Sequence, residues 1–284
     1  MDKNSQPKIY GVLGYPAKHS LSPLMHNAAF QALKINAEYR IFEKNPEELE
    51  GFLHSLFREN ILGLNVTVPY KERIIPFLEK LSLEAELIGA VNTLRASANK
   101  LEGFNTDGEG FLKHLTVDLG FDPGGKTIAL LGAGGAAKAL SVYLSKTKPK
   151  SIAIYDLDKN RLAALIKHLK ESFHKIEFKS AESIEGLNIG GSDLLVNATP
   201  VGMKESDPSP VDEKFIRAGL LVYDLIYNPK ETKLLKAARD KGASVSNGLG
   251  MLLYQGVASF EIWTGKKAPV EIMRQALNKG VAKT

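Results

Sequence analysis

Four short segments near the start of the chain bring together hydroxyl, amide, ammonium and carboxylate side chains that could do chemistry. They are residues 19–23, 65–71, 90–93 and 105–107. We place them at the ends of predicted strands, and open α/β sheets bind ligands beyond the carboxyl ends of their strands. Together these groups suit the binding of a polyhydroxylated acid, and Lys71 follows just beyond Pro69 at the carboxyl end of its predicted strand.

Each of these groups also has an ordinary structural interpretation. Ser22 followed by Pro23 is typical of a helix N-cap, and Asn92-Thr93 could form a turn. A single Lys–Asp pair is more often a surface ion pair than a catalytic pair. The functional interpretation therefore depends on a cofactor site farther along the chain.

A glycine-rich loop supplies that second site. Residues 132–137, Gly-Ala-Gly-Gly-Ala-Ala, directly follow the apolar run 128–131 and open a helical pattern, which matches G-x-G-x-x-A. Gly132 permits a tight turn, Gly134 lets a pyrophosphate approach the backbone, and Ala137 allows close helix packing. The alternative is a plain strand-to-helix turn, but strand, loop, helix and second strand in this order favour a dinucleotide site.

An acidic residue follows the second strand of this unit. Asp156 lies about twenty residues past the loop, where a carboxylate can accept hydrogen bonds from the ribose hydroxyls of NAD and would repel the 2′-phosphate of NADP. Arg161 could still reach a phosphate. Asp156 or Asp158 could instead cap the next helix.

Hydrophobic periodicity predicts the elements that position these residues. Strands are expected at residues 9–14, 61–68 and 90–94, in a run ending near Phe104, and at 127–131, 151–155, 193–196 and 220–225. Helices are expected from Ser22, from the Asn45-Pro46 capping signal and from about Asp158, with two more at 250–264 and 270–282. The pattern predicts an α/β protein whose second half is a parallel sheet with helical crossovers.

Length and composition exclude several classes of protein. The 284 residues suit one or two domains, and 44% hydrophobic with 24% charged residues is typical of globular chains. The net charge is +5. The sequence has no basic stripe with interleaved aromatic residues, so no nucleic-acid partner is expected. With no cysteine, and no signal-like or membrane-spanning run, we expect a cytoplasmic protein. The six histidines lack metal-ligand spacing, so no metal is expected.

A series of ordered motifs carries a family resemblance over nearly the whole chain. The motifs are Ser20-Leu21-Ser22-Pro23, Asn65-Val66-Thr67-Val68-Pro69 with Lys71, Gly89-Ala90-Val91-Asn92-Thr93, Asn105-Thr106-Asp107, the glycine loop, Asn197-Ala198-Thr199-Pro200, and Asn247-Gly248-Leu249-Gly250-Met251-Leu252 with Gln255. On these residues the chain resembles the shikimate dehydrogenases, which reduce 3-dehydroshikimate to shikimate in aromatic amino acid biosynthesis. The resemblance implies two α/β domains with a cleft between them. Residues 1–110 would form a substrate-binding catalytic domain with a mainly parallel sheet and 111–247 a Rossmann-type NAD(P)-binding domain, and helices in 248–284 would return to the first domain.

The resemblance also implies a role for each site residue. Lys71 and Asp107 would be the catalytic acid–base pair. The substrate carboxylate and ring hydroxyls would be held by Ser20, Ser22, Asn65, Thr67, Asn92, Tyr227 and Gln255. The cofactor would be held by Gly132, Ala133, Gly134, Gly135, Ala136, Asp156, Arg161, Thr199, Leu225 and Gly248.

One position departs from the usual family pattern. Many members carry Asn-Arg after the second strand, where the arginine faces the 2′-phosphate of NADP, but this chain has Asp156-Leu157. NADP(H) is the family default, and Asp156 favours NAD(H) or dual use. NAD-using relatives that also oxidise quinate tend to carry an acid here, so an NAD-dependent quinate/shikimate dehydrogenase is an alternative.

Rival functions remain to be separated. A methylenetetrahydrofolate dehydrogenase shares the domain plan but would not need the twin serines, and a non-catalytic ligand-sensing module would not need Lys71 and Asp107. Ser20-Leu21-Ser22 is of the shikimate type, although the space around it would decide between shikimate and quinate. We expect a small-molecule substrate and a monomer or homodimer.

Overall fold

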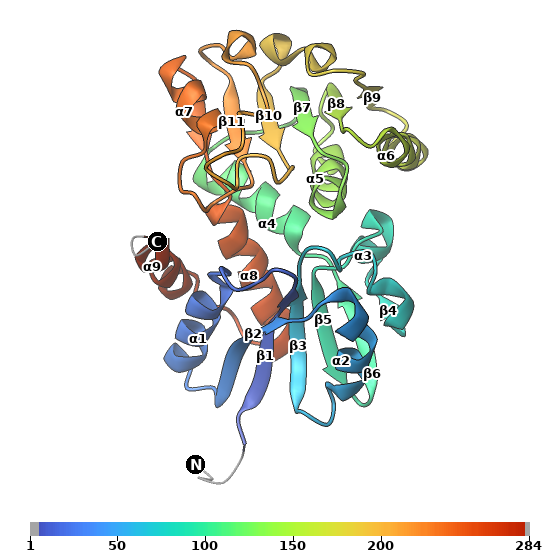
Figure 1. The fold of residues 1–284 in the computed structure, drawn as a ribbon, viewed down its shortest axis with the longest axis vertical. Coiled ribbons are helices and arrows are strands. Elements are labelled where there is room, and N and C mark those ends of the chain that lie inside the picture. The colour runs from blue at the N-terminus through green and yellow to red at the C-terminus, as the bar shows by residue number, and fades with distance from the viewer. Residues whose placement is uncertain (1–5, 282–284) are drawn as a thin grey trace. The chain divides into compact units, whose positions relative to one another are not determined.

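The chain divides into two compact units. The computed structural model describes residues 6–281. The first unit contains residues up to 110 and from 252 onward, and the second contains residues 111–251. The first unit thus contains both ends of the chain. Figure 1 shows this by colour: the red C-terminal helices lie beside the blue N-terminal strands and helix. The boundaries fall inside two helices, α4 (Asp107–Lys113) and α8 (Leu249–Thr264).

The first unit is built on a mixed six-stranded sheet of order β2-β1-β3-β5-β6-β4. Its strands are β1 (Lys8–Gly14), β2 (Ala37–Glu43), β3 (Ile61–Val66), β4 (Lys80–Leu81), β5 (Thr93–Ser97) and β6 (Lys100–Phe104). β5 runs antiparallel to β3 and β6, and the other pairs are parallel. Its helices are α1 (Ser22–Ala32), α2 (Leu49–Ser55), α3 (Leu83–Ile88), α8 and α9 (Val270–Val281).

Two predicted strands of this unit have different bounds. β3 ends at Val66 rather than residue 68. The strand expected at 90–94 begins at Thr93, because the preceding backbone bonds elsewhere: Val91 N–H donates to Lys71 O, and Asn92 O accepts from Val66 N–H. This short extended stretch therefore joins the two segments that carry Asn92 and Lys71.

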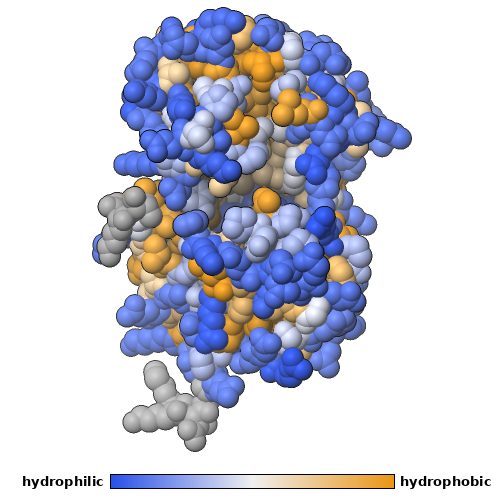
Figure 2. Space-filling model, viewed as in Figure 1, coloured by the Kyte–Doolittle hydropathy of each residue, from blue (hydrophilic) through white to orange (hydrophobic). Residues whose placement is uncertain are grey.

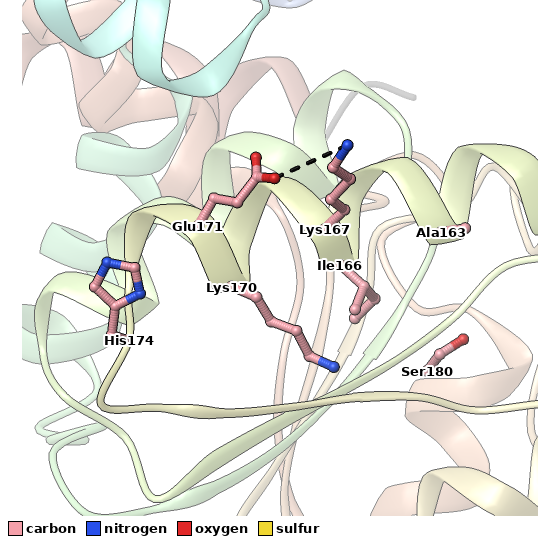
Figure 3. Close-up of a pocket in the computed structure, with 7 residues that line it drawn as sticks. All are labelled: Ala163, Ile166, Lys167, Lys170, Glu171, His174 and Ser180. Carbon is pink, nitrogen blue, oxygen red and sulfur yellow. Dashed lines mark ion pairs between the residues drawn. The ribbon is translucent and has the colours of Figure 1, made fainter.

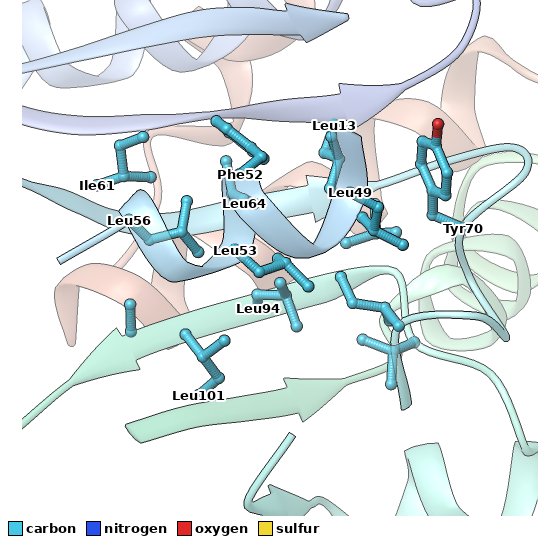
Figure 4. Close-up of a cluster of buried hydrophobic side chains, with 14 of the residues drawn as sticks. Leu13, Leu49, Phe52, Leu53, Leu56, Ile61, Leu64, Tyr70, Leu94 and Leu101 are labelled. Carbon is cyan, nitrogen blue, oxygen red and sulfur yellow. The ribbon is translucent and has the colours of Figure 1, made fainter. Parts of the chain in front are cut away.

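One face of the first sheet carries an apolar core under α2. Figure 4 shows Leu49, Phe52, Leu53 and Leu56 pointing from the helix region toward leucines of the sheet, among them Leu64. Asn45 and Glu48 form the predicted capping box ahead of α2. Leu49, Phe52, Leu53 and Leu56 are buried, whereas Phe57 is 37% exposed.

The C-terminal helices pack on an aromatic layer of the first unit. This layer is formed by Tyr10, His26, Phe30, Tyr39, Phe260 and Trp263. The Trp263 indole N–H donates to Leu94 O at 2.7 Å, and a Cβ on Gly63 would lie 2.4 Å from the indole nitrogen. The α9 helix packs on α1, where Gly280 gives space to Leu24. Glycines thus set how closely both C-terminal helices approach.

The second unit is a parallel six-stranded sheet of order β12-β11-β10-β7-β8-β9. Its strands are β7 (Thr127–Leu131), β8 (Ser151–Tyr155), β9 (Glu177–Ser180), β10 (Leu194–Asn197), β11 (Leu221–Asp224) and β12 (Ser244–Ser246). Its connecting helices are α5 (Gly135–Lys146), α6 (Lys159–Ser172) and α7 (Lys233–Asp240). The buried central strands and the parallel pairing expected of a doubly wound dinucleotide fold are both present.

Charged and polar residues dominate the visible face of the molecule, and apolar side chains form small separate areas (Figure 2). Within residues 6–281, no helix is long and apolar enough to cross a membrane.

Candidate active site

Lys71 and Asp107 form a close ion pair in the first unit. Lys71 follows the loop after β3, and Asp107 is the first residue of α4. Lys71 Nζ lies 2.5 Å from Asp107 Oδ2, and the two side chains are 17% and 6% exposed. The pair is therefore not the exposed surface ion pair that was its ordinary interpretation, since a largely buried ammonium and carboxylate can act on a bound reactant.

The Asn92 amide orients the carboxylate of this pair. Its Oδ1 accepts from the Thr106 backbone N–H at 2.8 Å, and its Nδ2 donates to Asp107 Oδ1 at 2.9 Å. Because a backbone N–H can only donate, the amide has one possible orientation. Nδ2 also lies 3.4 Å from Gln255 Oε1. Lys71, Asp107, Asn92 and Gln255, predicted from four separate motifs, thus share one buried cluster.

Asn65 and Ser259 extend this cluster across the sheet. Asn65 Nδ2 donates to Ser259 Oγ at 2.9 Å, and Ser259 Oγ lies 2.8 Å from Thr93 Oγ1 and 3.2 Å from Thr106 Oγ1. Ser259 is fully buried on α8 and was not predicted as a site residue. Its signal in the sequence is weak, because one serine in an apolar helix is compatible with many structures.

The remaining predicted substrate residues of the first unit lie at the start of α1 and after β3. The hydroxyl of Ser20 accepts from the Ser22 backbone N–H at 3.3 Å. The prediction that Ser22 is a helix N-cap is wrong: Ser22 is the first residue of α1 after Leu21, and no side-chain cap bond is made there. The Thr67 methyl fills space beside Gly14, where a Cβ would lie 2.4 Å away. Within residues 6–281, no hydrogen bond joins Ser20 or Ser22 to Lys71 or Asp107.

The glycine loop of the second unit is shaped as its sequence predicts. Gly132 has φ of +105°, a conformation that disfavours other residues, and a Cβ there would lie 3.0 Å from Ala198 O. Gly134 is the N-cap of α5, and the first turn carries no acidic side chain. The amide N–H groups of this turn can therefore bind an anionic pyrophosphate, which is the fit that a dinucleotide requires.

Asp156 supports the loop from the end of β8. Its Oδ2 accepts from Ala133 N–H at 2.7 Å, and its Oδ1 accepts from Asp158 N–H at 2.8 Å. Asp158, rather than Asp156, is the N-cap of α6, and its side chain accepts hydrogen bonds from the backbone N–H groups of Asn160 and Arg161. The Arg161 guanidinium lies 3.9 Å from an ideal Cβ on Gly134, so it is the basic group beside the loop.

A buried polar network fixes the loop that carries Thr199. Asn197 Oδ1 accepts from the Thr199 backbone and hydroxyl, and Asn197 Nδ2 donates to Asp224 Oδ1 at 3.0 Å. Burial raises the pKa of the Asp224 carboxyl. At the end of β11, a Cβ on Gly248 would lie 1.9 Å from Leu225 O, so no side chain fits there. Thr199, Leu225 and Gly248 thus have rigid surroundings.

Tyr227 follows β11 and belongs to the second unit. The other predicted substrate residues lie in the first unit. Its role in substrate binding stays a prediction.

A separate pocket of about 650 Å³ lies along the second half of α6. Figure 3 shows it lined by Lys167, Lys170, Glu171 and His174 of this region and by Ser180 of β9. The Lys167–Glu171 ion pair spans 3.9 Å on its rim. The pocket contains none of the predicted site residues. Within residues 6–281, no three His, Asp or Glu side chains are grouped to hold a metal ion.

Comparisons with known proteins agree with these motifs. A family model described as the shikimate dehydrogenase substrate binding domain matches residues 12–94, and one described as the shikimate 5′-dehydrogenase C-terminal domain matches residues 248–277. The shikimate dehydrogenase (NADP(+)) of Methanopyrus kandleri is 46% identical, covering 96% of both chains.

Two solved structures are also similar along nearly the whole chain. A shikimate dehydrogenase in complex with NADP⁺ has a TM-score of 0.90 and 38% identity, covering 98% of this chain and 97% of its own. The shikimate 5-dehydrogenase of Listeria monocytogenes, in complex with shikimate and NAD, has a TM-score of 0.85 and 36% identity, covering 95% and 96%. The identity to full-length relatives and the matching two-domain α/β architecture lead to one conclusion: this chain belongs to the shikimate dehydrogenase family.

Proposed function

We propose that this chain catalyses the reversible reduction of 3-dehydroshikimate to shikimate with a nicotinamide dinucleotide. The observation that carries the proposal is the largely buried Lys71–Asp107 pair, with Asp107 held by Asn92. Related proteins of the same family are named for this activity. Residues 1–110 and the C-terminal helices would bind the substrate, and the second unit would bind the cofactor.

Lys71 moves the proton in this mechanism. When bound, the nicotinamide supplies or accepts the hydride. During reduction the Lys71 ammonium donates a proton to the oxygen of the developing alkoxide, and during oxidation the amine takes the hydroxyl proton. Asp107 keeps Nζ in place by its ion pair, and Asn92 keeps the carboxylate from rotating. Ser20, Ser22, Asn65, Thr67, Asn92, Tyr227 and Gln255 would orient the carboxylate and ring hydroxyls of the substrate.

The cofactor would bind through Gly132, Ala133, Gly134, Gly135 and Ala136, with Thr199, Leu225 and Gly248 at the nicotinamide end. We propose NAD(H), or use of both nucleotides, although the name of the Methanopyrus kandleri relative specifies NADP⁺. The support is Asp156, whose carboxylate stands at the end of β8 and is tied to the loop. Arg161 is the residue that would allow NADP(H) to bind as well, because its guanidinium lies beside Gly134.

A two-by-two assay tests this proposal. Purified protein is given shikimate or quinate with NAD or NADP, and nicotinamide reduction is followed by absorbance. Turnover of shikimate is expected, with kcat/KM for NAD at least comparable to that for NADP. A hundredfold preference for NADP would contradict the cofactor assignment. Faster turnover of quinate would favour the quinate/shikimate alternative, and binding without turnover of either acid would favour a ligand-sensing module.

A further inference from the structure

We infer that Tyr39 and Ser259 are positioning residues for substrate recognition, because they fix opposite ends of the Asn65 side-chain amide. The inference rests on the proposed function, in which Asn65 holds a ring hydroxyl. Neither residue belongs to the motifs that identified the site. Tyr39 lies on the edge strand β2 and Ser259 on the helix α8. We call this pair of contacts on the Asn65 amide the clamp.

Tyr39 fixes the oxygen end of the amide. The Tyr39 hydroxyl donates to Asn65 Oδ1 at 2.8 Å, and both residues are buried. The orientation of Asn65 is set independently, since its Nδ2 lies 3.3 Å from Asn92 O, an atom that can only accept a hydrogen bond. The tyrosine must therefore be the donor in this contact.

Tyr39 is itself held on three sides. Asn27 bonds its backbone twice: Tyr39 N–H donates to Asn27 Oδ1 at 2.8 Å, and Asn27 Nδ2 donates to Tyr39 O at 3.0 Å. The His26 ring stacks on the tyrosine ring, with centroids 4.4 Å apart and planes inclined by 7°. An edge strand normally has unpaired backbone groups, and here the Asn27 side chain satisfies those of Tyr39. This arrangement fixes the hydroxyl that reaches Asn65.

Ser259 fixes the nitrogen end of the amide. Its Oγ accepts from Asn65 Nδ2 at 2.9 Å and is also within hydrogen-bond distance of Thr93 Oγ1 and Gln255 O. Ser259 is fully buried, so water does not replace these contacts. The same hydroxyl thus links Asn65 to the helix turn that carries Gln255, a second substrate residue.

Counting donors and acceptors shows what Asn65 has left for a ligand. An asparagine amide offers two N–H donors and two lone pairs. Ser259 takes one N–H, and Asn92 O with Thr93 Oγ1, both 3.3 Å away, share the other. Tyr39 uses one lone pair of Oδ1. Among residues 6–281 the second lone pair is not used, so a substrate hydroxyl bound here would donate to Asn65.

Two isosteric variants test the clamp in the full chain. Tyr39→Phe removes the hydrogen bond to Asn65 Oδ1, and Ser259→Ala removes the bond to Asn65 Nδ2 together with the other contacts of the same hydroxyl. Each variant removes little volume, and the KM for shikimate should rise about three- to tenfold. The kcat should stay within about twofold, and the KM for NAD should not change, because the nucleotide is bound by the second unit. The double variant should raise the shikimate KM by less than the product of the single effects, because both act on the same amide.

Matched controls separate positioning from general loss of stability. Tyr10→Phe removes a buried tyrosine hydroxyl from the same aromatic layer, and Ser55→Ala removes a buried helical serine hydroxyl that bonds Phe52 O. Both should keep the wild-type shikimate KM even if thermal unfolding shifts. Wild-type KM values for Tyr39→Phe and Ser259→Ala, or equal changes for shikimate and NAD, would overturn the inference. If one variant fails to fold, the other decides. A wild-type protein that does not oxidise shikimate would instead overturn the proposed function, and this inference with it.

Discussion

Asn92 Nδ2 donates to Asp107 Oδ1 at 2.9 Å, so the two oxygens of this carboxylate are divided between an amide and the Lys71 ammonium. The division holds the carboxylate plane fixed while Oδ2 holds Nζ. A lysine side chain has several rotatable bonds, and without the ion pair it would populate many rotamers in which Nζ lies elsewhere. Three side chains therefore determine where the Lys71 ammonium lies, as the proposed proton transfer requires.

Lys71→Ala should lower kcat for shikimate oxidation by about 10² to 10⁴-fold, which corresponds to roughly 3 to 5 kcal/mol of barrier. The KM values should change much less, because the variant removes the proton-transferring group. Steady-state kinetics with purified protein measures both. Lys126→Ala, which breaks the exposed Lys126–Asp193 pair, is the matched control and should keep wild-type kcat. Near wild-type turnover of Lys71→Ala would remove Lys71 from the chemistry.

Asp156→Ala should shift nucleotide preference toward NADP. The ratio of kcat/KM for NAD to that for NADP should fall about tenfold, equivalent to about 1.4 kcal/mol, because the variant removes a negative charge near the ribose. The kcat/KM values for NAD and for NADP will both fall, since Asp156 also accepts a hydrogen bond from Ala133 N–H. Asp158→Ala is the control: it removes a helix cap, worth about 1 kcal/mol of stability, and should leave the ratio unchanged. An unchanged ratio in Asp156→Ala would contradict the NAD assignment.

Two glycine-to-alanine variants should have opposite effects on stability. Gly248→Ala places a Cβ 1.9 Å from Leu225 O, so the backbone must shift, at a cost of about 1 to 3 kcal/mol and with a raised KM for the nucleotide. Gly51→Ala lies in α2 with nothing within 4 Å of the new Cβ, and should stabilise the fold by about 0.5 to 1 kcal/mol. Thermal unfolding of both proteins checks the signs.

His26 should make stability depend on pH on the acid side. It is fully buried, neither ring nitrogen has a hydrogen-bond partner among residues 6–281, and burial lowers its pKa from 6.5 to about 3. Below pH 6.5 the unfolded chain binds a proton that the folded chain does not. The free energy of unfolding therefore falls by about 1.4 kcal/mol per pH unit from this group as pH drops toward 3, and the contribution is complete above pH 6.5.

His26→Phe removes this proton-binding group while keeping a ring against Tyr39. Urea unfolding between pH 6.5 and 4 should show the wild type losing about 1.4 kcal/mol per pH unit relative to the variant. The slope is the informative quantity, because a packing difference shifts both ends of the range equally. Parallel pH profiles would mean that His26 becomes protonated inside the folded protein.

The sequence predicts every interior strand of both sheets, although β5 is displaced by three residues, and it misses all four edge strands. β7 and β8 have the predicted bounds, because each apolar run is largely buried and closed by turn residues. β2, β4, β9 and β12 stand at the ends of their sheets and were not predicted. An edge strand faces solvent along one side, so charged residues such as those of β2 interrupt the apolar pattern on which the prediction depends.

The candidate site was predictable where a motif carries its own chemistry. Lys71, Asp107 and Asn92 stand in short polar motifs, Gln255 comes from the family resemblance, and the structure brings the four together. Ser259 was not predictable, because its hydrogen bond to Asn65 joins residues 194 positions apart in the chain. The contact depends on how α8 packs against the first sheet, and local sequence patterns hold no information on that packing.

Trp263 and Ser259 complete a sheet whose strands were all made before residue 105. A ribosome synthesises the chain from the N-terminus, so the whole second unit, residues 111–251, is synthesised between the two parts of the first unit. A nascent chain that stops before residue 252 carries Lys71 and Asp107 but lacks the helix that closes their polar cluster. The unit whose strands are translated first therefore completes its fold last, and chains truncated before residue 252 should be inactive even with every motif of the first 110 residues intact.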